Sequence, residues 1–465
     1  MQYQKVIGAI EEQYQHGILN PGDKLPSLRQ MAQHMSVSLN TVIRAYQELE
    51  ANGTIRALPR SGYIVEEQLT TPLAKSERLE PRDVDTQSLI LSVLRDASRK
   101  DLVHMGSAHP RTDFPAVDKL YRIIARQARQ QVHQISHYRM PAASLTLRQA
   151  IARQHALRGE FQPPSDILIT QGAQQALSAT LQALTAPGDV IAVESPCYFG
   201  TLLSLEAHGL KVIEVPTNTR DGMDLDALAD VLRQWPVKAV LTAPTVNNPA
   251  GFTMPEAARR RLLALTGDLP IIEDDVYSDV SFGDIPPTLR SMDNSGRVVC
   301  LSSLSKSVDS RLRLGWITGG RYQDRIERSL IMANLGNVNL ISDGVTDFLQ
   351  AGLYQKHLRK IRRHYKGNFC VLRDALSSLM DLGCCLTQPT GGFLCWLRLP
   401  EAVDGYRIYE KALAAGIATS PGRMFSVSNL YPNYIRLNYA FVENNPHWQA
   451  SLDRLVKIIA EGIEP

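Results

Sequence analysis

The sequence predicts an α/β protein in three parts: a small helical head with a β-hairpin, a large α/β domain and a smaller C-terminal α+β domain. Helical apolar spacing, interrupted by turn residues, covers residues 1–65. Farther along, short β-rich runs alternate with helical stretches, which is typical of a mostly parallel sheet. At 465 residues, with 44% hydrophobic and 21% charged residues, the chain is long enough and ordinary enough in composition for several globular domains.

The head is predicted to contain helices followed by a hairpin. Residues 3–19 have helical apolar spacing, and the turn-rich stretch NPGDKLP follows them. Ser27 and Gln30 fit a capping box for a second helix, and Ser38 precedes a third. The stretch TIRALPRSGYIV then alternates around a Pro/Gly turn, as a hairpin does. Together these elements indicate a winged helix-turn-helix. The apolar residues predicted to share a helix face are Leu28, Met31, Ala32, Met35, Val42, Ala45, Tyr46 and Leu49.

In a winged helix-turn-helix, the last helix enters the major groove of DNA. Residues 24–65 carry five basic and two acidic residues, whereas residues 1–23 carry one basic and three acidic residues. The positive side therefore coincides with the expected DNA face. The alternative is a helical adaptor with solvated polar faces. The predicted contacts are Ser38, Asn40, Thr41 and Arg44 on the third helix, Ser27 and Arg29 near phosphates, and Arg60 and Ser61 at the hairpin tip.

The remaining chain is divided by composition. Residues 66–88 are polar, contain prolines and lack periodicity, so they predict a linker. We expect the large domain at 89–330 and the small domain at 331–465. The latter begins with a long helix, continues through the strand-like runs GGFLCWLRLP and NYIRLNYA, and closes with an amphipathic helix. The strands expected in the large domain are 166–170, 190–194, 211–216, 238–244, 270–274 and 297–303.

Unusual residues follow several of these strands. In an open α/β sheet, ligands gather beyond the carboxyl ends of the strands, where loops lead into helices. The stretch TQGAQQAL begins a helix whose free N–H groups favour a phosphate. In LSSLSKSVDSRLR, a lysine among serines lies seven residues before an arginine. Each feature alone has a plain explanation in capping or packing, and their order and spacing are what indicate one site. The residues are Ala173, Gln174, Tyr198, Asn248, Asp274, Asp275, Tyr277, Ser303, Ser305, Lys306 and Arg313.

With these motifs in place, residues 89–465 resemble the fold type I aminotransferases that depend on pyridoxal 5′-phosphate (PLP). Residues 1–65 resemble the GntR-type winged helix. In this order, the two resemble the MocR subfamily of bacterial transcriptional regulators. The resemblance implies PLP as cofactor, double-stranded DNA and an amino-acid-like effector as partners, and a homodimer.

The resemblance also implies a role for each residue at the strand ends. Lys306 is expected to be the catalytic lysine, which holds PLP as a Schiff base, the internal aldimine. Asp274 is expected to face the pyridine nitrogen, with Asp275 as the rival carboxylate. The phosphate is expected to be held by Arg313, Ser303, Ser305 and the amides of Ala173 and Gln174.

The other implied roles concern the ring, the effector and the second subunit. Asn248 and Tyr277 are expected to contact the phenolic oxygen of the cofactor, and Tyr198 to stack on its ring. Tyr138 is expected to reach the phosphate of the partner subunit, and Arg436 to bind the carboxylate of an amino acid. Ala143 replaces a glycine of the family near Tyr138, and NNPAG keeps an asparagine that true aminotransferases carry.

Two functions follow from this set of residues. The first is a DNA-binding regulator that senses PLP or an amino acid through Schiff-base (aldimine) formation. The second is a catalytically active aminotransferase with an appended winged helix. The complete winged helix favours the regulator, and the lysine and arginine leave residual transamination open.

Composition excludes other classes. No apolar run approaches the ~18 residues of a membrane span, so no membrane partner is expected. The six cysteines form no C-x-x-C pair and no zinc-like spacing, so we expect reduced thiols, no metal and a cytoplasmic protein. A net charge of +3 is too small to identify a partner.

Overall fold

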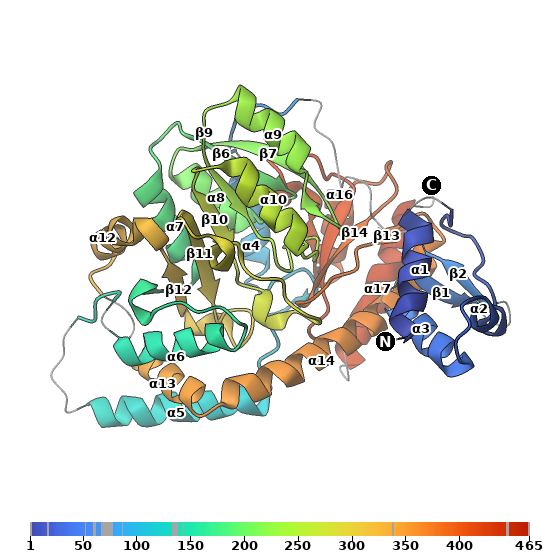
Figure 1. The fold of residues 1–465 in the computed structure, drawn as a ribbon, viewed down its shortest axis with the longest axis horizontal. Coiled ribbons are helices and arrows are strands. Elements are labelled where there is room, and N and C mark those ends of the chain that lie inside the picture. Colours follow the sequence, from blue (N-terminus) through green and yellow to red (C-terminus); the bar gives the residue numbers. More distant parts are fainter. Residues whose placement is uncertain are drawn as a thin grey trace. The chain divides into compact units, whose positions relative to one another are not determined.

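The head forms the predicted helices and hairpin, with boundaries set by its caps (Figure 1). Its elements are α1 (Gln2–Gln15), α2 (Leu28–His34), α3 (Leu39–Ala51), β1 (Ile55–Leu58) and β2 (Gly62–Val65). At the start of α2, Gln30 N donates to Ser27 Oγ at 3.4 Å and Ser27 N donates to Gln30 Oε1 at 3.0 Å, which is the predicted capping box. Val42, Ala45 and Tyr46 are buried in the core of the head. The winged helix-turn-helix prediction is confirmed.

The computed structural model describes residues 2–15, 18–51, 53–58, 62–66, 78–85, 87–132, 138–142, 144–336, 339–442 and 446–463. The chain divides into two compact units: the first contains the head and residues 385–388, and the second contains most of the remaining chain, including the main mixed sheet. Among the described residues, no helix combines the length and the apolar character that a membrane span requires.

The main sheet of the second unit has the strand order β3-β7-β6-β9-β10-β11-β12-β5, and β8 pairs with β7. The strands from β7 to β11 pair in parallel, whereas β12 is antiparallel to both β11 and β5. All six predicted strands are present. The strands are β3 (Arg82–Asp83), β5 (Ile167–Thr170), β6 (Val190–Ser195), β7 (Lys211–Asn218), β8 (Gly222–Met223), β9 (Val237–Thr242), β10 (Ile271–Asp274), β11 (Val298–Ser303) and β12 (Gly315–Thr318).

Helices cover both faces of this sheet. Successive strand residues point to opposite faces, and the apolar residues on each face pack against a different set of helices. Ile272 and Val299 pack with α7, α8 and α12, whereas Ile271 and Val298 pack with α9, α10 and α11. This two-sided burial explains why the central strands are continuous apolar runs. The helices are α5 (Pro115–Gln131), α6 (Leu145–Ala156), α7 (Ala173–Leu184), α8 (Phe199–Ala207), α9 (Leu225–Gln234), α10 (Glu256–Thr266), α11 (Leu289–Met292), α12 (Gln323–Ala333) and α13 (Asn339–Gln350).

The smaller sheet lies in the C-terminal part and has the order β13-β14-β17-β16. A separate strand pair joins β15 to β4, which lies near the start of the expected large domain in the sequence. The elements are α4 (Gln87–Asp96), β4 (Val103–His104), α14 (Leu353–Ala375), α15 (Ser377–Met380), β13 (Cys385–Leu386), β14 (Leu394–Arg398), α16 (Gly405–Ala414), β15 (Ile417–Ala418), β16 (Ser420–Pro421), β17 (Tyr434–Asn438) and α17 (Pro446–Ile463). Short 3-10 helices are Pro164–Asp166, Ser278–Val280, Ser310–Leu312, Gly320–Tyr322 and Gly422–Phe425.

These pairings differ in detail from the expected boundaries. Within the expected linker, residues 67–77 lie outside the described residues, and β3 at its far end pairs with β7 and forms the edge of the main sheet. Asp96 of α4 accepts a hydrogen bond from Tyr409 of α16 at 2.6 Å. With β4 on β15, the beginning of the expected large domain therefore packs on the small one. The single long helix expected after residue 330 is two helices, and the first, α13, packs on α5 and α6.

Candidate functional site

A cavity lies beyond the carboxyl ends of the parallel strands β6, β9 and β10, where an open α/β sheet places its ligands. It holds about 980 Å3 of space, including its open mouth. Most of the residues expected to bind the cofactor line it together. They are Ala173, Gln174, Tyr198, Asn248, Asp274, Tyr277, Ser305, Lys306 and Arg313.

One end of the cavity suits an anion. Helix α7 begins there after Gly172, whose φ is 85° and which provides no side-chain cap, so the first N–H groups of the helix stay available. The guanidinium of Arg313 lies close by and donates to Gln171 O at 3.1 Å. A Cβ at Gly172 would lie 2.7 Å from Arg313 Nη2 and would displace this guanidinium, and the positive φ of Gly172 also favours glycine. Helix amides, a guanidinium and the Ser305 hydroxyl thus converge at one place.

Ser303 has a different position from the one expected. It does not line the cavity, and its hydroxyl lies 2.8 Å from Ser305 Oγ. Ser303 Oγ also accepts from the Ser305 amide at 3.1 Å and contacts Leu314 O at 2.9 Å. In this structure Ser303 therefore lies behind Ser305 and orients its hydroxyl, and direct contact of Ser303 with a phosphate stays a prediction.

Lys306 is partly buried and lines the cavity. Its Nζ donates to Ala108 O at 2.8 Å and lies 5.8 Å from the centre of the Tyr277 ring. Burial, and after it the positive charge of Arg436, lowers the pKa of Lys306 to about 8, against the opposite effect of Asp274. About a tenth of this amine is neutral at pH 7, far more than of an ordinary lysine, and the neutral amine is the state that attacks a carbonyl carbon.

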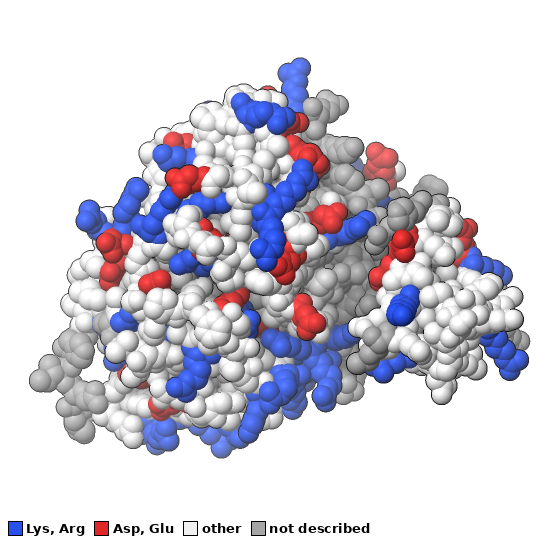
Figure 2. Space-filling view, in the orientation of Figure 1, with Lys and Arg blue, Asp and Glu red and all other residues white. Residues whose placement is uncertain are grey.

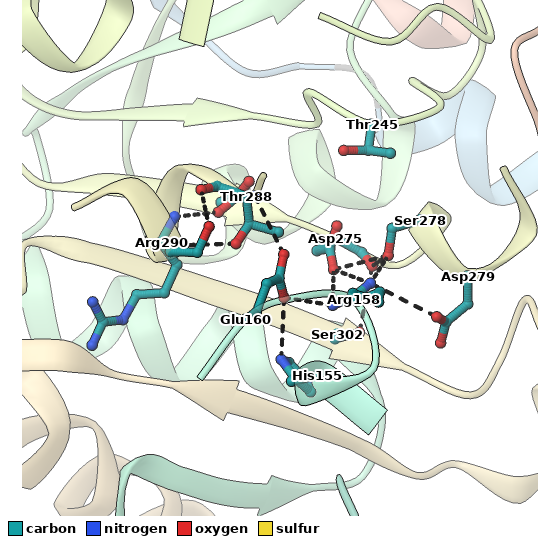
Figure 3. A network of polar contacts seen from close by, with 12 residues as sticks. His155, Arg158, Glu160, Thr245, Asp275, Ser278, Asp279, Thr288, Arg290 and Ser302 are labelled. Carbon is teal, nitrogen blue, oxygen red and sulfur yellow. Dashed lines mark hydrogen bonds and ion pairs between the residues drawn. The ribbon is translucent and has the colours of Figure 1, made fainter. Parts of the chain in front are cut away.

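The structure distinguishes the two adjacent carboxylates. Asp274 lines the cavity and accepts from Val276 N at 3.1 Å, and burial raises its pKa to about 6. Asp275 instead joins a buried polar network, shown in Figure 3, in which Arg158 lies 3.2 Å and Ser278 Oγ 2.9 Å from its carboxylate. Only Asp274 is therefore placed to meet a ligand in the cavity.

Two aromatic hydroxyl groups and one amide complete the cavity. Tyr277 is buried, and its hydroxyl has no hydrogen-bond partner in the described part of the chain. A buried hydroxyl without a partner costs free energy, so a ligand atom is its expected partner. Burial raises the pKa of both Tyr198 and Tyr277, so both stay protonated. Asn248 presents its amide to the same space and contacts Arg436.

Arg436 is a buried cation behind the cavity, with 1% of its surface exposed. It donates to Asn248 Oδ1 at 2.9 Å, to Gly106 O at 2.7 Å and to Ser420 Oγ at 3.3 Å. Burial lowers its pKa to about 10, and no described carboxylate is ion-paired with it. Uncompensated buried charge is expensive, which favours an anionic ligand at this position.

The head presents its expected DNA residues on α2 and α3. Asn40 and Arg44 are exposed on α3, Arg29 is exposed on α2, and the Arg44 guanidinium lies 4.2 Å from the centre of the Tyr3 ring. Ser27 Oγ belongs to the capping box. The N-terminus of α3 is capped by Ser38, whose Oγ accepts from Thr41 N at 3.2 Å and lies 2.8 Å from Thr41 Oγ1. Arg60 and Ser61 lie outside the described residues.

Comparisons with known proteins agree with both parts. Residues 2–65 match the model of the gntR family of bacterial regulatory proteins, and residues 100–447 match that of aminotransferase class I and II. The uncharacterized HTH-type transcriptional regulator YjiR of Escherichia coli (strain K12) is 35% identical over 94% of this chain and 94% of its own. The HTH-type transcriptional regulator TauR of Rhodobacter capsulatus is 30% identical over 92% of this chain and 90% of its own.

The chain belongs to the MocR-type regulators of the GntR family. A solved structure similar to this regulator is the kynurenine aminotransferase of Pyrococcus horikoshii in complex with PMP. Its TM-score is 0.73 at 28% identity, with 84% of this chain and 98% of that chain covered. The regulator is thus a DNA-binding transcription factor with an aminotransferase-like domain, as the sequence predicted.

The cofactor of the aminotransferase-like domain is PLP, and the cavity of this regulator fits it. The anion cradle at Gly172 can bind a phosphate, and the Lys306 amine can react with an aldehyde. The Tyr277 hydroxyl, which has no partner among the described residues, can form a hydrogen bond with a phenolic oxygen. The donor set therefore agrees with each polar group of the cofactor.

Tyr138, expected to act across a dimer, is 74% exposed and does not line this cavity. Ala143, the nearby departure from the family pattern, lies outside the described residues. The cross-subunit role of Tyr138 stays a prediction.

Sequence reasoning missed Glu194, a buried residue of the cavity wall. Its carboxylate accepts from Ala243 N and Asn247 Nδ2, both at 2.9 Å, and from Thr242 Oγ1 at 2.5 Å. It therefore fixes the loop that carries Asn248 in the regulator. The signal was present in the sequence, because Glu194 stands near the end of an apolar strand like the other residues of the site.

Proposed function

We propose that this regulator binds an amino acid in the PLP cavity and that this binding changes its affinity for operator DNA. The observation that carries the proposal is Arg436, a buried cation without a described carboxylate partner that is hydrogen-bonded to the cavity residue Asn248. A guanidinium is suited to a carboxylate because it donates two parallel charge-assisted bonds. An amine that carries a carboxylate fits both Arg436 and Lys306.

When bound, PLP supplies an aldehyde that takes up primary amines and a ring that withdraws electrons. Lys306 would hold the cofactor covalently and release it when an effector amine takes its place. Arg313, Ser305 and the amides of Ala173 and Gln174 would bind the phosphate, and Asp274 would face the ring nitrogen. Asn248, Tyr277 and Tyr198 would orient the ring.

We also propose that the regulator acts as a homodimer in the cytoplasm. Large apolar or aromatic side chains are exposed near α5 and α6, including Val132 at 72% and Leu145 at 51%. Such groups support an interface between copies of the chain. A protein that binds chromosomal DNA must work in the compartment that holds the chromosome, which supports the cytoplasmic assignment.

The second candidate function is transamination. Lys306, Asp274 and Arg436 together supply an amine, an acid for the ring nitrogen and a carboxylate site. The aromatic-amino-acid aminotransferase 1 of Thermococcus litoralis is 30% identical over 81% of this chain and 92% of its own. Turnover beside regulation is therefore compatible with the cavity.

One titration tests both functions. Purified protein with PLP is mixed with each common amino acid, while the ultraviolet-visible spectrum and the affinity for its own upstream DNA are followed. An effector should change the spectrum and the DNA affinity at the same concentration. Rapid conversion of the amino acid to its oxo acid, without any change in DNA binding, would instead identify an enzyme whose winged helix does not respond to the amino acid.

A further inference from the structure

Helix α14 of the second unit carries a row of exposed cations that has no role in the cofactor cavity. Exposed Lys356, Arg359, Arg363 and Lys366 recur at helical spacing, so they lie on one side of the helix. Figure 2 shows Lys and Arg side chains gathered over this region, along the lower edge of the second unit. These four residues are called the α14 stripe below.

The stripe is electrostatically uncompensated. None of its four residues has a carboxylate partner within the described ranges of the chain. The helix contains a single acidic residue, Asp374, which pairs with Arg373 near its end. On and before the adjacent helix α5, Asp118 pairs with Arg122 and Asp113 with Arg111. The positive charge therefore faces solvent without neutralisation.

The core of the unit does not need these cations. The opposite face of α14 buries Leu358, Ile361, Tyr365 and Phe369, so the apolar side of the helix is already used. A membrane-surface helix would need that apolar side for lipid. A two-fold contact of the stripe with its own copy would bring like charges together. Both alternatives are therefore disfavoured.

We propose that the α14 stripe binds the phosphate backbone of double-stranded DNA as a second contact, in addition to the winged helix. Lys356 and Lys366 are separated by roughly 15 Å along the axis at ~1.5 Å per residue. Each strand of B-DNA carries one phosphate per ~3.4 Å of axis, so this length covers roughly four phosphates. DNA is the regular polyanion that a transcription factor always meets. This inference goes beyond the proposed function, because it requires neither PLP nor an effector.

The test removes four charges from the stripe and compares the result with the removal of four charges elsewhere. The stripe variant is K356Q/R359Q/R363Q/K366Q in the full-length protein. The control is K238Q/R325Q/R407Q/K411Q. It replaces four exposed cations elsewhere in the same unit, so it removes the same amount of positive charge. Glutamine keeps the helix propensity of the stripe, and equal thermal midpoints and PLP spectra verify that both variants fold.

The measurement is the salt dependence of binding to a mixed-sequence DNA duplex of about six helical turns. With ~0.9 units per phosphate contact, the stripe variant should lower the slope of log K against log salt by roughly 3–4 units and weaken binding at least about tenfold at physiological salt. The control should change the slope by less than about 1 unit. Equal losses in both variants would overturn the proposal. The proposal would also be overturned if the stripe variant lost binding to polyglutamate but kept its DNA binding, because the stripe would then bind an acidic protein.

Discussion

Arg436 and Asn248 are joined by a hydrogen bond of 2.9 Å between Nη1 and Oδ1, so a buried cation and a residue of the cofactor cavity form one unit. Phe425 and Phe199 flank the guanidinium, with ring centres 5.0 and 5.6 Å from its carbon. This apolar enclosure strengthens the attraction for an anion because it excludes water. The pair connects the site for the effector carboxylate to the site for the cofactor ring.

The first prediction is that Arg436→Gln abolishes recognition of the effector carboxylate. Loss of a buried charge-assisted bond costs about 2–5 kcal/mol, which corresponds to roughly 30-fold to several thousand-fold in affinity. Spectral titration with amino acids should show this loss, while titration with the corresponding amines that lack a carboxylate should be unchanged. An equal loss for both ligand classes would mean that the substitution damages the cavity as a whole.

The second prediction concerns covalent attachment and its pH dependence. Borohydride reduction of the protein with PLP should label Lys306, and Lys306→Ala should remove the label while the exposed Lys238→Ala keeps it. The neutral amine reacts, and the pKa of Lys306 is lowered to about 8. The rate of capture by the cofactor-free protein should therefore rise about tenfold per pH unit below pH 8 and level off above it. A rate that keeps rising to about pH 10 would show an ordinary lysine.

The third prediction separates the two neighbouring aspartates. Asp274→Asn should leave the thermal midpoint nearly unchanged, but should alter the absorption of bound PLP and its reaction with amines. Asp275→Asn should destabilise the fold by about 3–5 kcal/mol, because it weakens a buried ion pair with Arg158. Thermal unfolding and absorption spectra of both variants provide the comparison. The reverse pattern would assign the ring nitrogen to Asp275.

Sequence reasoning located the strands because their burial on both faces made them continuous apolar runs. It missed β12, whose four residues begin with Gly315. A Cβ at Gly315 would lie 2.8 Å from Gly172 C, so the close approach of β12 to the turn before α7 requires this glycine. Such a requirement belongs to the tertiary fold and leaves no periodic signal. Asp274 could be preferred over Asp275 only through the family resemblance, because composition does not encode the direction of two adjacent side chains. The position of Ser303 behind Ser305 depends on side-chain direction in the same way.

The fourth prediction concerns Tyr138, whose proposed partner is the phosphate of the other subunit's cofactor. Tyr138→Phe removes only the hydroxyl, so the protein should remain a dimer by sedimentation but bind PLP more weakly. One lost hydrogen bond to a charged group is worth about 1.5–3 kcal/mol, or roughly 10- to 150-fold in affinity. A monomer with normal PLP affinity would remove both the dimer and the role of Tyr138 from the proposal.

The last prediction distinguishes reading of bases from binding of phosphates in the head. If Arg44 reads a guanine edge, Arg44→Ala should lose about 1–3 kcal/mol of discrimination at one base pair in each half-site. If Arg29 holds a phosphate, Arg29→Ala should weaken binding to all sequences alike and lower the salt slope by about 1 unit. Binding measured over a set of single-base operator variants separates the two outcomes, with PLP binding unchanged in both proteins.

The position of Arg44 over the Tyr3 ring sharpens this prediction, because the aromatic face holds the guanidinium on α3. Tyr3→Ala should therefore reduce discrimination at the same base pair as Arg44→Ala, whereas Tyr3→Phe, which keeps the ring, should preserve it. In a double-mutant cycle, the effects of Tyr3→Ala and Arg44→Ala on that base pair should not add. Additive effects would show that Tyr3 does not position Arg44, and a uniform loss of affinity in Arg44→Ala would place this arginine on the phosphate backbone instead.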